Sequence, residues 1–291
     1  MSEKILFLGY GYAARALAAL LRAEGWTIAG TARSPEKAAA LEAESVEPVF
    51  WTDSGIDPRA LDGAGALLVS TPPDEDGCPS FRALREQLPA RAGAIAWTGY
   101  LSSNGVYGDH GGAWVDETSN LVPTTKRGFA RIAAEAEWAG WAVEYSAPFA
   151  IFRLPGIYGP GRSALETVRE GRAQRIYKEG QVFNRMHVDD IAAALKASIQ
   201  RPLAGDLFNL SDDEPSPPQD VIEYACKLLG VEPPPLVPLE EAALSEMGRS
   251  FYGDNKRVRN GRMKETLGVT LRYPTYREGL DALFRDGFAN A

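Results

Sequence analysis

The sequence predicts a doubly wound α/β fold, a parallel sheet with helices on both faces, followed by a smaller C-terminal lobe. Two observations lead to this prediction. Short apolar runs alternate with alanine- and leucine-rich helical stretches through the first 154 residues, and such alternation implies right-handed crossovers in a parallel sheet. From about residue 155, prolines and glycines become frequent and irregular stretches lengthen, which suits a lobe built on the end of the sheet.

The first strand and helix are marked by their ends. Residues 4–8 form a compact apolar run that stops at glycines, as in a buried parallel strand. Residues 12–24 follow with a helical pattern, and Gly25 is placed to cap its C-terminal end. The first unit is therefore a strand, a glycine-rich turn and a helix.

The same alternation continues along the chain. Residues 27–31 are expected to form a second strand, and Ser34 followed by Pro35 is typical of a helix N-cap and first turn, opening a helix through about Glu44. Further strands are expected at 46–51, 66–70, 94–98, 149–154 and 207–210, and further helices at 81–91, 126–141, 189–199 and 218–229.

Composition excludes several classes of protein. The 291 residues are 45% hydrophobic and 24% charged, as in ordinary globular proteins. A net charge of −8, from 31 basic and 39 acidic residues, repels phosphate backbones and disfavours nucleic-acid binding. Two cysteines and two histidines are too few for a disulfide framework or a histidine-based metal site. The N-terminus lacks an export signal and no apolar run could span a bilayer, so we expect a cytoplasmic protein without metal or membrane partner.

The glycine-rich turn points to a dinucleotide. Residues 9–14 fit the pattern G-x-G-x-x-(G/A), and they follow the first predicted strand and open the first helix. Gly9 would permit the tight turn, Gly11 would let the backbone approach a pyrophosphate, and Ala14 is small enough for close helix–strand packing. Tyr12 begins the helix beside this site. The alternative is a strand–helix turn without a ligand, and a ring of Tyr10 or Tyr12 filling the hollow would favour it.

The end of the second strand indicates which nicotinamide cofactor binds. NAD sites place an acidic residue there, whereas this chain has Arg33 and Ser34 and no carboxylate. Arg33 is suited to pair with a 2′-phosphate and to lie over the adenine, so we expect NADP in preference to NAD. A solvated arginine in an exposed loop is the alternative. Further cofactor contacts are expected from Ser70, Thr71, Arg131 and Pro155.

Four later segments resemble a known family. They are L-S-S-N-G-V-Y-G at 101–108, R-L-P-G-I-Y-G-P-G at 153–161, H-V-D-D at 187–190 and F-N-L-S-D at 208–212. In this order they resemble the extended short-chain dehydrogenase/reductases, the superfamily of NAD-dependent epimerases and dehydratases. The cofactor turn differs from the G-x-x-G-x-x-G spacing of many extended members and is similar to that of atypical members.

The resemblance implies an organisation into two parts. We expect a Rossmann-type, NAD(P)-binding domain over residues 1–160, to which 187–210 return, and a substrate lobe mainly over 161–291. Relatives often dimerise through two helices of the cofactor domain, so the resemblance also allows a homodimer, although the sequence does not fix the oligomeric state.

The family's proton relay is missing from this chain. In the family a serine or threonine orients the substrate oxygen, a position held here by Ser103, and a Tyr-x-x-x-Lys pair moves the proton. Alignment on Pro123 and Glu135 puts Arg127 at the tyrosine position and Arg131 at the lysine position. Arg131 could still bond ribose or phosphate oxygens, but a guanidinium cannot replace a phenol because it is effectively never deprotonated.

Other polar residues are expected to be structural. Tyr107 and Tyr158 lie in segments where relatives use aromatic residues for packing. His187 belongs to a motif in which histidine and aspartate fix a loop against the next helix, and Thr125 is placed to cap a helix. Arg185 lies two residues before His187, not at the four-residue spacing of the family's phosphate-gripping arginine.

Two functions from different classes remain open. The first is an NAD(P)-binding oxidoreductase or epimerase/dehydratase-like enzyme acting on a small hydroxyl- or carbonyl-bearing substrate, including sugar derivatives. In that case Ser103 orients the substrate and water or another side chain handles the proton. The second is a catalytically silent NADP(H)-binding regulator or sensor, which explains the missing tyrosine directly.

Overall fold

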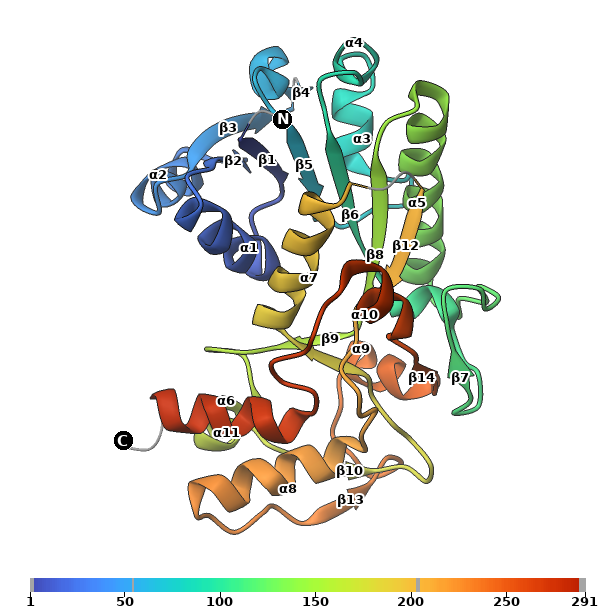
Figure 1. Cartoon of the computed structure of the whole chain (residues 1–291). Helices are drawn as coiled ribbons and strands as arrows, with labels where there is room; N and C mark the ends of the chain where they lie inside the picture. Colours follow the sequence, from blue (N-terminus) through green and yellow to red (C-terminus); the bar gives the residue numbers. More distant parts are fainter. Residues whose placement is uncertain (1–2, 54, 203–204, 288–291) are drawn as a thin grey trace.

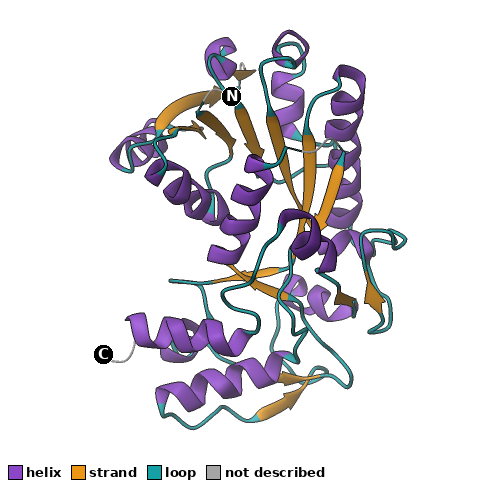
Figure 2. Ribbon diagram, viewed as in Figure 1, coloured by secondary structure: helices purple, strands orange, loops and turns teal. Residues whose placement is uncertain are grey.

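The fold is built on one eight-stranded sheet. A computed structural model describes residues 3–53, 55–202 and 205–287. The strand order is β12-β8-β6-β5-β1-β2-β3-β4, and every neighbouring pair is parallel except β3 and β4. The strands are β1 (Lys4–Leu8), β2 (Thr27–Ala32), β3 (Glu47–Thr52), β4 (Gly55–Ile56), β5 (Ala66–Val69), β6 (Trp97–Ser103), β8 (Phe149–Leu154) and β12 (Asp206–Asn209). The predicted doubly wound α/β fold is confirmed (Figures 1 and 2).

Helices cover both faces of the sheet. One face packs against α1 (Tyr12–Ala23), α2 (Pro35–Ala43) and α7 (Val188–Gln200), and the other against α3 (Pro79–Leu84), α4 (Leu88–Arg91) and α5 (Lys126–Tyr145). Strand β1 is apolar from Ile5 to Leu8 because both of its faces are covered by helices. Ile5 and Phe7 point to the first layer of helices and Leu6 and Leu8 to the second, since side chains alternate across a strand.

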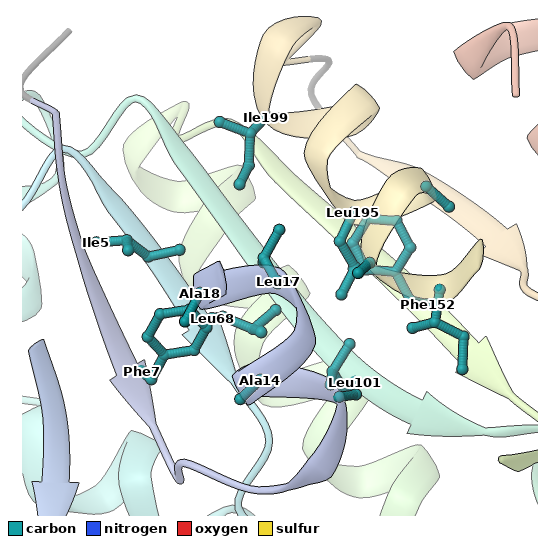
Figure 3. Packing of buried hydrophobic residues seen from close by; sticks show 14 of the residues in the cluster. Ile5, Phe7, Ala14, Leu17, Ala18, Leu68, Leu101, Phe152, Leu195 and Ile199 are labelled. Carbon is teal, nitrogen blue, oxygen red and sulfur yellow. The ribbon is translucent and has the colours of Figure 1, made fainter. Parts of the chain in front are cut away.

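The layer around α1 is the core beneath the glycine-rich turn. Ala14, Leu17 and Ala18 of α1 lie against Phe7 and Leu68 of the sheet (Figure 3). Small residues at positions 14 and 18 let the helix approach the sheet closely. The start of α1 is thereby held above the carboxyl end of β1, where open α/β sheets bind their ligands.

Two predicted elements differ from the structure. The helix expected at 81–91 is two short helices, α3 and α4, because Pro89 lies in the first turn of α4 and proline cannot continue a helix from the preceding turn. The strand expected at 94–98 is β6, which begins at Trp97. The amides of Ala94 and Ile95 both donate to the Arg91 carbonyl, so these residues close α4 instead of pairing with the sheet.

A second group of elements forms the C-terminal lobe, drawn below the sheet in Figure 1. Its helices α6, α8 and α11 share a small core that includes Leu165, Val221 and Leu280. The lobe helices are α6 (Ala164–Arg169), α8 (Pro218–Leu229), α9 (Glu246–Ser250) and α11 (Tyr276–Gly287). Helix α10 (Gly261–Leu267) lies between α9 and α11 in the chain but packs Met263 and Leu267 into the core layer of α1 and α7 on the sheet. Short parallel pairs join β9 (Gly156–Tyr158) to β11 (Arg185–His187), β10 (Arg175–Tyr177) to β13 (Leu236–Pro238) and β7 (Trp114–Val115) to β14 (Arg257–Val258). The described residues also form three 3₁₀ turns: η1 (Pro58–Leu61), η2 (Asn104–Tyr107) and η3 (Phe251–Gly253).

Candidate functional site

The two glycines of the turn after β1 differ in whether the fold would accept a side chain at their position. Gly9 has φ +94°, and a Cβ there would lie 2.8 Å from Ser70 Oγ, so only glycine fits. Gly11 is the N-cap of α1 and has an ordinary φ of −95°. A Cβ on Gly11 would meet nothing within 4 Å. The fold requires glycine at position 9, whereas the space beside Gly11 is open.

Three hydroxyl groups fix this turn from below. The amide of Gly9 donates to Thr31 Oγ1 (2.9 Å). Ser70 Oγ donates to the Gly9 carbonyl (2.7 Å), and Thr71 Oγ1 donates to the Leu8 carbonyl (3.0 Å). The carbonyls of Leu8 and Gly9 are thus already hydrogen-bonded. The N-cap residue Gly11 has no side chain that could accept from the first amides of α1. The start of α1 therefore presents main-chain donors suited to an anion.

The two tyrosines of the turn do not fill the space at Gly11. Tyr10 is buried, with its ring packed edge-on against Phe7 at a centroid distance of 5.5 Å. Tyr12 Oη donates to the Pro160 carbonyl (3.0 Å), so this side chain reaches toward the C-terminal lobe. Burial raises the pKa of Tyr12 to about 12, which keeps the phenol protonated at neutral pH and makes it a donor and not a base.

The predicted 2′-phosphate residue lies on an aromatic side chain. Arg33, exposed just beyond β2, has its guanidinium carbon 4.3 Å from the ring centroid of Trp51 on β3. Ser34 caps α2, with its Oγ accepting from the Lys37 amide (3.2 Å). Arg33 is thus held at the end of β2 by stacking, and no hydrogen bond or ion pair of its guanidinium is recorded among the described residues.

The two arginines at the relay positions point to different partners. Arg131 Nη1 donates to the Leu101 carbonyl (2.7 Å) and to Tyr100 Oη (3.3 Å), at β6. Arg127 is exposed; its Nη2 donates to Ser250 Oγ (3.3 Å) and its guanidinium lies 5.4 Å from the Phe251 ring. Arg131 is therefore tied to the sheet and Arg127 to the lobe.

The loop after β6 uses its side chains to hold its own shape. Ser103 Oγ accepts from the Gly105 amide (3.1 Å), capping η2, which leaves the hydroxyl proton for another acceptor. Tyr107 is buried, donating to Asn209 Oδ1 (2.8 Å) and accepting from Arg153 Nη1 (3.1 Å). Burial raises the Tyr107 pKa. Neither contact makes Tyr107 a base at neutral pH. Pro155 lies directly after β8, half-buried.

A buried ion pair lies beneath this loop, and sequence reasoning did not single it out. Arg153 on β8 bonds both carboxylate oxygens of Glu135 on α5, at 3.1 and 2.7 Å. Ser102 Oγ on β6 donates to the same carboxylate (2.5 Å). The pair joins α5 to the strands that carry Ser103 and Pro155, so it fixes their relative positions. A usable sequence signal was Glu135, which with Glu137 is one of two acids in the otherwise apolar stretch 132–143.

The H-V-D-D segment anchors α7. His187 Nδ1 accepts from the Asp189 amide (3.2 Å), and its ring lies between Tyr158 and Tyr273 at 5.1 and 4.1 Å. Burial lowers the His187 pKa, so the imidazole is neutral at pH 7. Asp190 accepts from the amides of Arg272 (2.8 Å) and Tyr273 (3.0 Å). The segment ties the sheet domain to the approach to α11.

A cavity of about 540 Å³ lies among α6, α8 and α11 of the lobe. Arg185 lines it, and its Nη1 donates to the carbonyls of Phe183 and Ser216. Arg172 also lines it and is bonded to Glu170. Other lining residues include Tyr158, Arg162, Gln174, Pro218 and Tyr276. The wall also carries Glu166 and Glu170, so it is polar, and its arginines are suited to an anionic group of a ligand.

Two kinds of feature are absent from the described residues. Those residues contain no group of three or more His, Cys, Asp or Glu side chains arranged to hold a metal ion. None of their helices is both long and apolar enough to cross a bilayer.

The chain is similar in sequence and in structure to several known proteins. It is 29% identical to Protein YeeZ of Escherichia coli (strain K12) over 293 residues, covering 94% of this chain and 97% of that protein. It matches the structure of a functionally unknown conserved protein from Silicibacter pomeroyi DSS with a TM-score of 0.90 and 49% identity, over 98% and 99% of the two chains. A UDP-glucuronic acid 4-epimerase from Bacillus cereus in complex with NAD has the same fold, with a TM-score of 0.75 and 16% identity over 97% of each chain.

The family match covers the later part of the candidate site. Residues 91–211 match the model for the "NAD dependent epimerase/dehydratase family". This stretch includes Ser103, both relay positions and the H-V-D-D segment. The match is a similarity to this family over residues 91–211, and the eight-stranded sheet with the lobe at its carboxyl edge gives the whole chain the fold of the NAD-bound epimerase structure.

Proposed function

We propose that this protein binds a nicotinamide dinucleotide at the turn between β1 and α1 and acts on a small hydroxyl- or carbonyl-bearing substrate as an oxidoreductase or epimerase/dehydratase-like enzyme. The observation that carries the proposal is the open space beside Gly11, at a helix start whose N-cap has no side chain. A pyrophosphate fits there and would accept bonds from the main chain. The dinucleotide, when bound, supplies hydride transfer.

The residues proposed to hold the cofactor come from the ends of four strands and from the helices α1 and α5. The glycine turn would contact the pyrophosphate, and the ends of β2 and β5 would contact the adenosine half and support the turn. Arg131 and Pro155 would face the nicotinamide half. The full proposed set is Gly9, Gly11, Tyr12, Ala14, Arg33, Ser34, Ser70, Thr71, Arg131 and Pro155, and the cofactor-binding unit is residues 1–160 with 187–210.

We further propose NADP(H) as the preferred cofactor. Arg33 follows β2 where an NAD site would carry an acid, and its guanidinium has no carboxylate partner among the described residues. Stacking on Trp51 holds the charge at the end of the strand. A 2′-phosphate would find a planar donor there that a 2′-hydroxyl does not need.

The substrate is proposed to enter the lobe cavity, within residues 161–291 for the most part. Arg162 and Arg185 supply cations to its wall and Tyr158 and Tyr276 supply rings, which suits a sugar derivative carrying an anionic group. A similar fold is found in MoeE5 in complex with UDP-glucose and NAD. Ser103, whose hydroxyl proton has no recorded acceptor among the described residues, would orient the reacting oxygen.

A catalytically silent NADP(H)-binding regulator is the second candidate. The specific observation in its favour is that both relay positions are in structural use, with Arg131 bonded to β6 and Arg127 bonded to the lobe. Turnover of any substrate in a panel of sugar nucleotides and small hydroxy or oxo compounds, lost in Ser103→Ala, would exclude it. Cofactor binding without turnover across that panel would instead favour the regulator.

Cofactor binding is tested with a matched pair of glycine variants. Gly11→Ala places a methyl group in open space at an ordinary φ, so the variant should melt like the wild type without ligand. It should lose dinucleotide affinity by about tenfold or more because the methyl meets the pyrophosphate. Gly93→Ala, also in open space, is the control and should bind normally.

The measurement is thermal shift with NAD, NADH, NADP and NADPH, since a ligand of the folded state raises the apparent melting temperature with occupancy. Stabilisation of the wild type and of Gly93→Ala, reduced in Gly11→Ala, supports the proposal. The absence of stabilisation of the wild type by all four dinucleotides would refute it.

A further inference from the structure

A hairpin of the lobe contacts the glycine-rich turn directly. Gly159 and Arg162 exchange backbone hydrogen bonds (3.1 and 3.0 Å) just after β9. The carbonyl of Pro160, at the tip, accepts from Tyr12 Oη (3.0 Å). A Cβ on Gly159 would lie 2.6 Å from Tyr12 Oη and 2.7 Å from Val188 Cγ1. The hairpin backbone is thus packed on the first residue of α1 as closely as glycine allows.

Arg162 on this hairpin borders two sites. Its guanidinium carbon lies 5.8 Å from the ring centroid of Tyr12, the residue that follows Gly11. The same residue lines the lobe cavity. Burial holds the Tyr12 pKa at about 12, so the Tyr12–Pro160 bond that supports this arrangement keeps its proton across the neutral range.

The charge of Arg162 is not neutralised by the neighbouring acids. Glu166, the nearest acid on α6, accepts from the Gly161 amide (3.0 Å) and from Ser163 Oγ. Asp189 is 3.6 Å from His187 Nδ1 and 4.0 Å from Arg272. Among the described residues, Arg162 has no carboxylate within ion-pair distance, whereas Arg172 on the same cavity wall is paired with Glu170. Arg162 is exposed, and an uncompensated guanidinium near the ring of the first residue of α1 is suited to pair with a phosphate bound at that helix start.

We propose that Arg162 is a positioning residue shared by the cofactor turn and the cavity: it pairs with the pyrophosphate of the bound dinucleotide, and the Tyr12–Pro160 bond holds its hairpin in place. This inference rests on the proposed function. It implies that cofactor binding restrains the cavity wall, because the hairpin leads directly into α6 through the N-cap Ser163. Cofactor and substrate sites would then be coupled through one side chain.

The test compares four variants by calorimetric titration with NADPH. Arg162→Ala should weaken binding by roughly 10- to 100-fold, the equivalent of losing a hydrogen bond to a charged group, and Arg162→Lys should recover part of the loss. Tyr12→Phe removes only the bond to Pro160 and should cost about two- to tenfold. In Tyr12→Phe/Arg162→Ala the two losses should not add, because both act through one hairpin.

Arg15→Ala is the matched control. It removes an arginine from α1, the helix that begins with Tyr12, but this arginine is paired with Glu44 (2.9 Å). The NADPH affinity of the variant should therefore match that of the wild type. ADP-ribose keeps the pyrophosphate and lacks the nicotinamide, so it should show the same loss in Arg162→Ala. A loss confined to nicotinamide-bearing ligands, or an affinity of Arg162→Ala within twofold of the wild type, would overturn the assignment. A wild-type chain that binds no dinucleotide would overturn the proposed function as well, and the two failures are thereby distinguished.

Discussion

Single residues decide which chemistry this site supports. Arg127 and Arg131 are the residues that the resemblance aligns with the usual relay, and the structure gives each a partner, Ser250 and the Leu101 carbonyl. The phenols near the site do not compensate, since burial raises the pKa of both Tyr12 and Tyr107. In the proposed enzyme, proton transfer would then fall to water, to another side chain or to a group of the substrate, and we expect slow turnover compared with a site that has a tuned phenol.

Cofactor selectivity is a second property set by one residue. Arg33→Ala removes the only charge proposed for the 2′-phosphate, so NADPH affinity should fall by roughly 10- to 100-fold, as for a lost charge-assisted bond, while NADH affinity stays unchanged. Calorimetric titration of both ligands measures the ratio. Arg91→Ala is the control, because it removes an arginine of α4 that is paired with Asp62. Equal losses for NADPH and NADH would contradict the assignment.

At the scale of elements, the predictions succeeded where the signals are local. The apolar run of β1, the glycines after it and Gly25 at the end of α1 lie within one stretch of about two dozen residues. The structure differs where one residue interrupts a pattern, as Pro89 does between α3 and α4. Pairs such as β9 with β11 join short segments far apart in sequence. The local sequence of a three-residue strand does not predict which strand it will pair with.

The same distinction applies to the candidate site. The glycine turn is a local motif and could be predicted with its helix. The contact of Tyr12 with Pro160 spans 148 positions, and the pair of Arg153 with Glu135 joins a strand to a helix. Both depend on how the layers pack, so the sequence alone did not reveal them.

The buried pair predicts how strongly α5 is held to the sheet. Glu135→Ala leaves the Arg153 guanidinium buried without its carboxylate, which should lower the free energy of unfolding by about 3–5 kcal/mol. Replacing both residues by methionine should recover part of this loss, although Ser102 and Tyr107 would each still lose a partner. Urea unfolding measures both variants. Arg59→Ala, which breaks an exposed pair with Asp57, should change stability by less than about 1 kcal/mol; a Glu135→Ala variant as stable as this control would contradict the role of the pair.

At the scale of the whole molecule, α5 offers a face for a second copy of the chain. Phe129, Ala133, Ala136, Gly140 and Val143 are all exposed and follow the alternating spacing of four and three that forms one seam along a helix. Phe129 is 61% exposed and Val143 82% exposed, and the small residues between them allow close approach of another helix. We therefore propose a homodimer paired through α5.

The dimer is tested by placing a charge in the middle of this seam. The wild type should have a mass of about twice 31.5 kDa by light scattering coupled to size exclusion, and Ala136→Glu should shift it to the monomer because two like charges would meet near the symmetry axis. Ala39→Glu adds the same charge at an exposed position of α2 and should leave the dimer intact. A monomeric wild type, or a dimer that survives Ala136→Glu, would show that α5 is not the contact. Because α5 also carries Arg127 and Arg131, a confirmed seam would place the dimer contact on the same helix as the two proposed relay positions.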